Sequence, residues 1–299
     1  MQRPEVLEAC PLCNSKNLSL AIRTIDFMVS EKAFDISKCN NCHFHFTNPR
    51  PQEEQVSSYY HQEKYLSHSK KQFSIVEKIY QLAKRYTLNW KLKNIEKLKG
   101  NRTPLNILDV GCGTGDFIKH CRKKNHKVVG VEPADDIRKK LISADQLLVH
   151  KYLAELNQKE FDVITFWHVL EHVYNLDESI QQVKTLLKED GLVFVALPNH
   201  QSYDAKKYGK YWAGWDVPRH LWHFSKEDVK TLCKKHELKL LKIIPMKLDA
   251  YYVSMLSERY MRGKQNPMSL IAALFYGCLS NIKAKKENNY SSLIYILQK

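Results

Sequence analysis

The sequence predicts an α/β fold, a doubly wound parallel sheet with helices on both faces. Between residues 105 and 199, short apolar runs alternate with segments of helical periodicity, which is typical of a parallel sheet. The first apolar run stops at three glycines, Gly111, Gly113 and Gly115, and the next one ends at an acid, Glu132. Ligands of such sheets bind at the carboxyl ends of the strands, so we expect the binding site there.

A glycine turn follows the first of these strands. Residues 106–115 read N-I-L-D-V-G-C-G-T-G, and Ile107 to Val110 form the predicted buried strand. Glycine adopts a positive φ and lets a ligand approach the backbone where a side chain would clash. Asp116 then begins a helical pattern. An acid at the position of Glu132 can accept hydrogen bonds from both hydroxyls of a ribose. The pattern therefore predicts a nucleotide-type cofactor.

The remaining elements follow from the same periodicities. We expect strands at 107–110, 128–131, 147–149, 162–167 and 192–197, and helices at 117–124, 134–143 and 176–188. Beyond residue 200 we expect strands at 238–244 and 292–297 and helical stretches within 251–286. Ser225 to Asp228 resembles a capping box, which predicts a helix at 229–236.

The N-terminal segment carries two C-x2-C pairs, separated by 25 residues. Two such pairs place four thiolates around one ion, which is a structural zinc pattern; the predicted ligands are Cys10, Cys13, Cys39 and Cys42. Segments 18–24 and 33–37 between the pairs are expected to form paired strands, which gives a zinc ribbon. Four unligated thiols are the alternative. A site filled by four cysteines leaves no open position for chemistry.

Size and charge limit the classes of protein. The chain has 299 residues, enough for one large domain and a small accessory one. Its net charge of +15 is concentrated in residues 56–104 and 200–299. Basic flanks attract an anionic partner, which leaves a phosphate-bearing small molecule, an acidic glycan, RNA or a membrane surface; a solvated lysine-rich surface is the alternative. No apolar run approaches the roughly 20 residues of a membrane span, and we expect a cytoplasmic protein with reduced cysteines.

Three elements together resemble class I S-adenosylmethionine-dependent methyltransferases: the turn at 107–115, Glu132, and residues 161–173, F-D-V-I-T-F-W-H-V-L-E-H-V. The resemblance implies a seven-stranded Rossmann-like sheet whose last strand is antiparallel, with 238–244 and 292–297 as the final hairpin. The cysteine pairs, the T-N-P-R-P turn at 47–51 and the segment from Pro218 to Ser225 resemble bacterial small-molecule or glycan methyltransferases that carry an N-terminal zinc ribbon.

The resemblance divides the chain into a zinc ribbon (1–52), a helical linker or lid (53–103) and a cofactor-binding methyltransferase domain (104–299) with substrate-side insertions in 200–290. Tyr59, Tyr60 and Tyr65 lie near the start of the linker. They either belong to a core or interface or close over the cofactor.

The resemblance also assigns cofactor contacts. The turn would hold the methionine moiety, Asp109 would organise it, Glu132 would bind the ribose, and residues 152–155 would lie near the adenine. Phe166, Trp167 and His168 would flank the sulfonium; a cation near an aromatic face is stabilised by about 0.5–2 kcal/mol, which suits Trp167. Cys112 is expected to be an apolar filler rather than a nucleophile. The predicted contacts are Asp109, Gly111, Cys112, Gly113, Gly115, Glu132, Trp167 and His168.

Methyl transfer to oxygen usually needs a base, and histidine is suited to that role. The candidates are His168, His172, His220 and His223, and Arg219 would pair with an anionic group of the acceptor. The alternative for the segment around residues 212–223 is that its histidines and its tryptophans, Trp212, Trp215 and Trp222, only close the core. In ubiquinone-type O-methyltransferases a comparable Glu-x-x-Glu-His stretch binds a divalent metal. Here His168 replaces the first acid, which leaves His168, Glu171 and His172 as candidate ligands.

We therefore expect S-adenosylmethionine-dependent methyl transfer to a small, anionic or sugar-like acceptor, at oxygen. The competing function is RNA methylation, with the ribbon and the basic flanks gripping the phosphate backbone. Enzymes that methylate exocyclic base nitrogens carry an Asn/Asp-Pro-Pro-aromatic stretch after the fourth strand, where this chain has W-H-V-L. A nicotinamide dehydrogenase fits poorly, because the turn is G-x-G-x-G. A non-enzymatic binding protein on the same scaffold is a further alternative.

Overall fold

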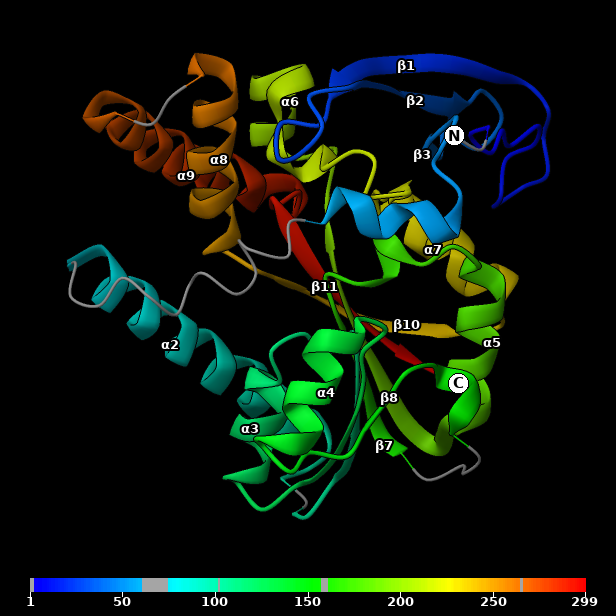
Figure 1. The fold of residues 1–299 in the computed structure, drawn as a ribbon, viewed down its shortest axis with the longest axis vertical. Coiled ribbons are helices and arrows are strands. Elements are labelled where there is room, and N and C mark those ends of the chain that lie inside the picture. The colour runs from blue at the N-terminus through cyan, green and yellow to red at the C-terminus, as the bar shows by residue number, and fades with distance from the viewer. Residues whose placement is uncertain (1–2, 61–74, 102, 157–160, 264–265) are drawn as a thin grey trace. The chain divides into compact units, whose positions relative to one another are not determined.

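The fold comes from a computed structural model that describes residues 3–60, 75–101, 103–156, 161–263 and 266–299 (Figure 1). The strands are β1 (Leu18–Ile25), β2 (Ala33–Cys39), β3 (His45–Thr47), β4 (Asn106–Val110), β5 (Lys127–Val131), β6 (Val149–His150), β7 (Phe161–Trp167), β8 (Leu187–Pro198), β9 (Trp222–His223), β10 (Lys239–Pro245) and β11 (Ser292–Gln298). The helices are α2 (Ile75–Leu98), α3 (Asp116–Arg122), α4 (Asp135–Ser143), α5 (Leu176–Leu186), α6 (Tyr203–Tyr208), α7 (Lys226–Lys235), α8 (Asp249–Arg262) and α9 (Pro267–Glu287). Short 3-10 turns include η1 (Glu53–Tyr59), η3 (Leu153–Glu155), η4 (Leu170–His172), η5 (Gly209–Tyr211) and η6 (Ala213–Trp215).

The strands form two sheets. The larger one has seven strands in the order β10-β11-β8-β7-β4-β5-β6, and β4 pairs in parallel with both β5 and β7. The predicted parallel sheet is therefore confirmed, and β10 and β11 are neighbours in it, as expected for the final hairpin. The smaller sheet has the order β1-β2-β3-β9.

The chain divides into two compact units. The first unit consists of Met1–Tyr60, His168–Leu176 and Val195–Leu297. The second unit consists of His61–Trp167, Asp177–Phe194 and Gln298–Lys299. The predicted cofactor turn belongs to the second unit, and the predicted zinc ribbon and the segment around His220 belong to the first.

In the second unit, the predicted elements appear close to their expected ends. Ile107 and Leu108 of β4 are fully buried, as both faces of a central parallel strand must be. The predicted helix at 176–188 ends earlier, at Leu186, and β8 begins at Leu187. The charged residues at the start of β8 form ion pairs, Lys188 with Asp162 and Asp190 with Lys99. They therefore extend the strand rather than the helix. Of the segment expected to be helical from residue 53, the structure describes a 3-10 turn at 53–59 and helix α2 at 75–98; Tyr65 lies outside the described residues.

In the first unit, the predicted pairing of β1 with β2 is confirmed, from Leu18 opposite Cys39 to Ile25 opposite Ala33. The sheet is completed by a distant segment, because β3 pairs with β9. The capping box at the start of α7 is also confirmed. A buried cluster of Ile36, Tyr208, Trp212, Trp215 and Val217 holds β2 against the segment that leads to β9.

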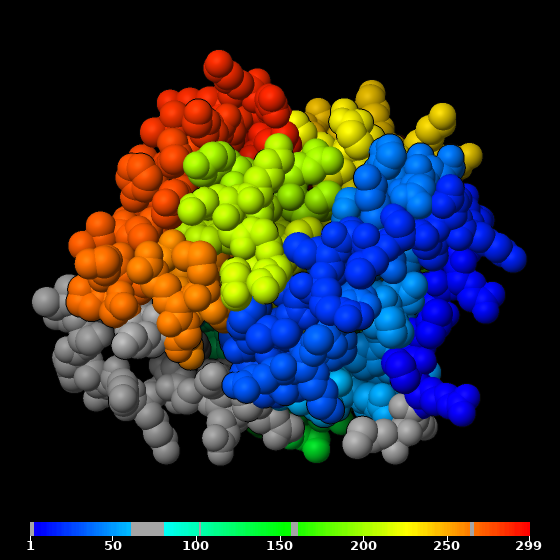
Figure 2. Space-filling view, turned by 90° about the horizontal axis from the view of Figure 1, so that it is seen from above, coloured from blue at the N-terminus to red at the C-terminus, as the bar shows by residue number. Residues whose placement is uncertain are grey.

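Figure 2 shows part of this unit from outside: the blue N-terminal strands lie beside yellow-green α6, with orange and red α8 and α9 next to α6. Among the helices that the structure describes, none is long and apolar enough to cross a membrane.

Candidate active site

The glycine turn after β4 has the strained backbone that only glycine adopts readily. Gly111, Gly113 and Gly115 have φ values of +66°, +52° and +70°. The amides of Gly111 and Cys112 donate to the carbonyl of Val131, at 2.7 and 3.0 Å, which ties the turn to the end of β5. A Cβ placed on Gly113 would meet no atom within 4 Å. The turn therefore presents backbone to open space at Gly113.

Glu132 lies directly beside this space. Its carboxylate accepts hydrogen bonds from the amides of Gly113 and Ala134, at 2.8 and 2.9 Å. Burial raises the pKa of Glu132, and these backbone donors oppose the shift. Each carboxylate oxygen has a second lone pair, so Glu132 keeps acceptor capacity for two further hydroxyl donors. These acceptor positions fit the 2′ and 3′ hydroxyls of a ribose.

Asp109 lies in β4, beneath the turn. It is 2% exposed and accepts a hydrogen bond from the hydroxyl of Thr165, at 2.7 Å. Burial raises its pKa to about 7, although Thr165 and the ammonium of Lys91 oppose the shift. Asp109 therefore changes its charge near neutral pH.

Trp167, at the end of β7, carries an unused donor. Its Nε1 is buried and has no hydrogen-bond partner within the described residues. Phe117 packs edge-on to the ring at 5.3 Å, and the ammonium of Lys91 lies 4.1 Å from its centroid. The ring can thus hold a cation.

Two further positions were singled out on the cofactor side. Cys112 is buried, and a Cβ on Gly130 would meet its sulfur at 2.8 Å, so the thiol fills space beside β5. Burial raises its pKa, which keeps the thiol protonated. Tyr152, just before η3, is 53% exposed.

His168 follows Trp167 in the chain and belongs to the first unit. It has a φ of +60°, and its amide donates to the carbonyl of Ala196 at 3.1 Å. Its Nε2 lies 3.0 Å from Asp249 and its Nδ1 lies 3.5 Å from Glu171. Burial would lower the pKa of His168, but the two carboxylates outweigh it and raise the pKa to about 9. His168 is therefore a cation at neutral pH.

Glu171 is the most deeply buried acid of this cluster, at 1% exposure. Neither carboxylate oxygen has a hydrogen-bond partner within the described residues. Burial would raise its pKa, but His168 and His220 outweigh this effect and lower it. The main chain of Glu171 accepts from the amide of Leu221 at 2.8 Å, which holds η4 beside the His220 segment.

Two histidines face Glu171. The Nδ1 atoms of His172 and His220 lie 3.0 and 2.9 Å from the carbonyls of Arg219 and Gly214. A carbonyl only accepts, so these contacts place the ring proton of His220 on Nδ1 and leave a lone pair on its Nε2. That Nε2 lies 3.9 Å from Glu171.

Burial and the nearby His220 lower the pKa of His172 to about 4. One ligand atom from each of Glu171, His172 and His220 lies within 4.8 Å of the others.

Arg219 lies in an ion-pair network inside the first unit. Its guanidinium binds Asp216 at 2.6 Å and Asp26 at 3.0 Å, and it donates to the carbonyl of Tyr59 at 2.9 Å. It is 6% exposed. The charge expected to meet an anionic acceptor is therefore balanced by carboxylates of the protein.

His223 lies within the smaller sheet, opposite His45 of β3. Its Nε2 is 3.0 Å from the hydroxyl of Thr47, and burial lowers its pKa well below the ordinary value. The structure thus brings His168, His172 and His220 together around Glu171 and places His223 elsewhere. Sequence reasoning missed Asp249 and Asp26, which have no motif around them.

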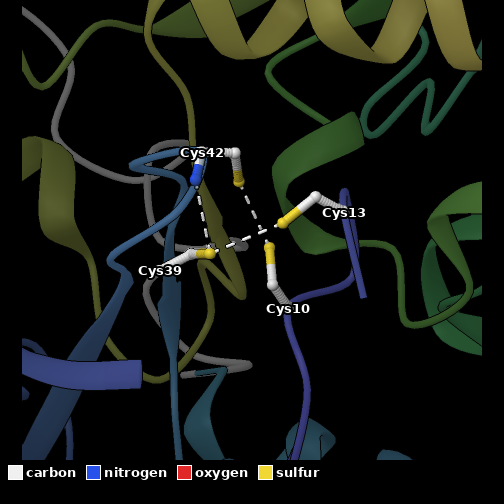
Figure 3. Close-up of side chains that lie close together, drawn as sticks. All are labelled: Cys10, Cys13, Cys39 and Cys42. Atoms are coloured by element: carbon white, nitrogen blue, oxygen red, sulfur yellow. Dashed lines mark hydrogen bonds between the residues drawn. The ribbon is translucent and has the colours of Figure 1, made fainter. Parts of the chain in front are cut away.

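The four N-terminal cysteines converge, as Figure 3 shows. The sulfurs of Cys10 and Cys42, and those of Cys13 and Cys39, are 3.5 Å apart, and all four lie within 4.8 Å of one another. A tetrahedral zinc with Zn–S bonds of about 2.3 Å needs sulfurs about 3.8 Å apart. The amide of Cys42 lies 3.5 Å from the sulfur of Cys39, as a donor to a thiolate would. The donor set therefore fits a structural zinc ion.

Comparison with known proteins shows the family to which the chain belongs. The family model described as "Methyltransferase domain" matches residues 80–243. The ubiquinone biosynthesis O-methyltransferase of Glaesserella parasuis is 26% identical over 196 residues, which cover 56% of this chain and 77% of that protein. The enzyme of the same name from Nitrosococcus oceani is 29% identical over 212 residues, covering 66% and 82%.

Solved structures share the fold at low sequence identity. A putative sarcosine dimethylglycine methyltransferase from Galdieria sulphuraria has a TM-score of 0.53 at 14% identity and covers 73% of this chain and 87% of its own. Coclaurine N-methyltransferase has a TM-score of 0.51 at 13% identity and covers 82% and 81%. With the family model matching more than half of the residues, the chain belongs to the methyltransferase domain family and is an enzyme with the class I methyltransferase fold.

Proposed function

We propose that this methyltransferase takes its methyl group from S-adenosylmethionine, bound at the glycine turn of the second unit. The observation that carries the proposal is the buried carboxylate of Glu132 beside the open space at Gly113. Glu132 accepts the ribose hydroxyls, and the turn from Gly111 to Gly115 receives the methionine end. The sulfonium of the donor supplies the activated methyl group. The ring of Trp167, which already attracts the ammonium of Lys91, stabilises a cation there.

The proposed acceptor is a small molecule that is methylated at a hydroxyl group. His220 takes the proton at its Nε2, because its Nδ1 proton is directed to the carbonyl of Gly214. The carboxylate of Glu171 then stabilises the imidazolium that forms. The relatives named as ubiquinone biosynthesis O-methyltransferases support oxygen as the methylated atom.

The second part of the acceptor proposal is that the acceptor bears a phosphate or carboxylate, and the excess of basic residues in 200–299 supports it. His168 does not supply that charge, because Asp249 and Glu171 lie beside its ring and balance it. Arg219, held by Asp216 and Asp26, positions the loop that carries His220 and does not contact the acceptor.

A divalent cation among Glu171, His172 and His220 is a second candidate for the same centre. It is favoured because the oxygens of the buried Glu171 carboxylate have no hydrogen-bond partner within the described residues beyond the 3.5 Å ion pair with His168, and its two histidine neighbours lie at ligand spacing. Imidazole and carboxylate ligands suit Zn²⁺ or Mn²⁺. Metal analysis of wild type and Glu171→Gln distinguishes the two, because a chelator would also remove zinc from the N-terminal cysteines. A divalent ion beyond that zinc which is lost in Glu171→Gln favours the cation, and its absence favours His220 as base.

The N-terminal cysteines are proposed to hold a structural zinc ion within a ribbon module of residues 1–52, joined by the linker or lid 53–103 to the methyltransferase domain 104–299. Zinc-ligating thiolates need a reducing compartment, and we propose the cytoplasm.

The experiment that tests the proposed function uses methyl-labelled S-adenosylmethionine and fractionated cell extract. We expect the label in small, anionic molecules, in base-stable form as an ether. Label in RNA that disappears after nuclease treatment would instead support the competing RNA methyltransferase, for which the basic segments are the argument. His220→Ala provides the control for enzyme-dependent label. Absence of label in every fraction, with donor binding intact, would contradict the acceptor class.

A further inference from the structure

Helix α9 has its small residues inside and its large apolar residues outside. The residues that α9 buries are Ser269, Ala273, Gly277, Ser280 and Ala284. Exposed on it are Met268 (69%), Ile271 (68%), Phe275 (61%) and Ile282 (54%). Their spacing of three, four and seven residues places these side chains along one outer face. A surface helix in water has the opposite arrangement, with the apolar stripe toward the core.

The orientation of α9 is fixed by close packing against α8. A Cβ added to Gly277 would lie 2.9 Å from the Cα of Tyr251, so the two backbones approach as closely as glycine permits. Small residues at a helix interface allow such an approach, with large apolar side chains turned outward, as in membrane-embedded helix pairs. Rotating α9 to bury Phe275 would push large side chains into this contact.

Polar contacts also hold α9 in this rotation. The hydroxyl of Ser280 donates to the buried carboxylate of Asp204 in α6, at 2.6 Å. Asn266 and Ser269 form a capping box at the start of the helix. The ammonium of Lys207 lies 4.5 Å from the ring centroid of Tyr276. The outward apolar face is therefore a built feature of the first unit.

Positive charge surrounds this face. The exposed cations are Lys206, Lys207 and Lys210 at α6 and η5, Arg259 and Arg262 on α8, and Lys283, Lys285 and Lys286 on α9. Glu287 is the one exposed acid on α6, α8 and α9, whose residues the structure describes throughout. The buried acids have partners inside the unit: Glu258 pairs with Arg262, and Asp204 accepts hydrogen bonds from Ser280 and Trp212. Figure 2 shows α6, α8 and α9 together on one outer face.

We propose that α9, with α8 beside it, is the surface by which this enzyme lies on an anionic lipid bilayer. An apolar helix face flanked by Lys and Arg lies in the plane of the bilayer interface. Each basic residue near an anionic surface adds attraction of about 1 kcal/mol. A second copy is disfavoured as the occupant, because it would bring two strongly basic faces together. Since α9 is not apolar enough to span, it rests on the bilayer.

Vesicle flotation of the full chain tests this proposal, with phosphatidylcholine vesicles that contain or lack phosphatidylglycerol. We expect wild-type protein to float with the anionic vesicles and to be released by salt. The double variant Ile271→Ser/Phe275→Ser should bind at least about tenfold more weakly, because it lacks two apolar side chains that the bilayer would bury. Lys285→Glu/Lys286→Glu should also lose binding. Leu20→Ser, which removes a 59% exposed leucine of β1, is the matched control and should bind as wild type.

Three outcomes would overturn the proposal. The first is wild-type protein that stays with the soluble fraction when anionic vesicles float. The second is equal binding of Ile271→Ser/Phe275→Ser and wild type, with unchanged thermal unfolding of the variant. The third is a wild-type dimer in gel filtration that the same double variant converts to a monomer, which would identify a second copy as the occupant. None of these outcomes depends on whether the chain transfers methyl groups to a hydroxyl acceptor.

Discussion

Nε2 of His220 lies 3.9 Å from the carboxylate of Glu171, while Nδ1 of the same ring faces the carbonyl of Gly214 at 2.9 Å. The carbonyl of Gly214 accepts the proton on Nδ1 and so fixes the tautomer of His220. The lone pair of Nε2 is therefore on the side of the buried carboxylate of Glu171. Two acceptors in such proximity are stabilised when a proton or a cation lies between them. This relationship makes His220 the first member of the cluster to test as a general base.

His220→Ala should lower kcat by about 10²-fold or more, the usual contribution of a general base, and leave S-adenosylmethionine binding unchanged. Steady-state kinetics and calorimetry separate the two effects. His223→Gln is the comparison: it should lower the melting temperature, because it removes the contact with Thr47, and retain kcat. A His220→Ala enzyme with wild-type kcat would remove His220 from the mechanism.

Binding of S-adenosylmethionine should strengthen as the pH rises through about 7. Burial raises the pKa of Asp109 to about 7, so its negative charge, which attracts a cationic donor, forms in this range. The dissociation constant is expected to fall between pH 6 and pH 8 in wild type and to stay flat in this range in Asp109→Asn. Thr165→Val, which removes the hydrogen bond to the carboxylate, should move the transition to higher pH. A flat wild-type profile would exclude titration of Asp109 from the binding step.

The folded state should lose stability as the pH rises from about 6.5 to about 9. Asp249 and Glu171 raise the pKa of His168 to about 9. A group with a raised folded pKa contributes fully below its unfolded pKa and loses that contribution as the pH rises through the folded one. Because His168 is partly exposed, we expect an effect of about 1 kcal/mol rather than the full shift. Urea unfolding at pH of about 6.5 and about 9 should show that the free energy of unfolding of wild type falls between the two values. In His168→Gln this fall should be about 1 kcal/mol smaller.

Purified protein should contain one zinc ion per chain, measured by elemental analysis. Removing it with a chelator should lower the melting temperature, since a structural metal contributes directly to folding. Cys39→Ser should lose both the metal and the stability, whereas Cys278→Ser, an exposed cysteine of α9, should keep both. Metal content unaffected by Cys39→Ser would locate any zinc elsewhere.

The local elements of the fold follow from local sequence. The apolar run before the glycines predicts β4, and Ser225 with Asp228 predicts the capped start of α7, because each signal lies within a few residues of the structure it forms. The convergence of the four cysteines joins positions as distant as Cys10 and Cys42, but it was predictable because the spacing of each pair is that of a metal knuckle.

Distant pairings were not predictable in this way. Asp249, 81 positions from His168, raises its pKa, and Asp26, 193 positions from Arg219, balances its charge. Thr47 meets His223 only because β3 pairs with β9, 176 positions away. Nothing near Asp249 or Asp26 in the chain marks them, since their roles arise from tertiary topology. The positive φ of His168 is likewise set by its place after β7 and not by its residue type.

Calorimetric titration of S-adenosylmethionine into wild type, Glu132→Ala and Asp135→Asn tests the central claim most directly. We predict one site in wild type and binding at least about tenfold weaker in Glu132→Ala, because hydrogen bonds to a charged acceptor contribute about 1.5–3 kcal/mol. Asp135→Asn, which changes an exposed carboxylate three residues along the chain, should bind as wild type. Wild-type protein that gives no binding, or Glu132→Ala protein that binds as tightly as wild type, would contradict the account.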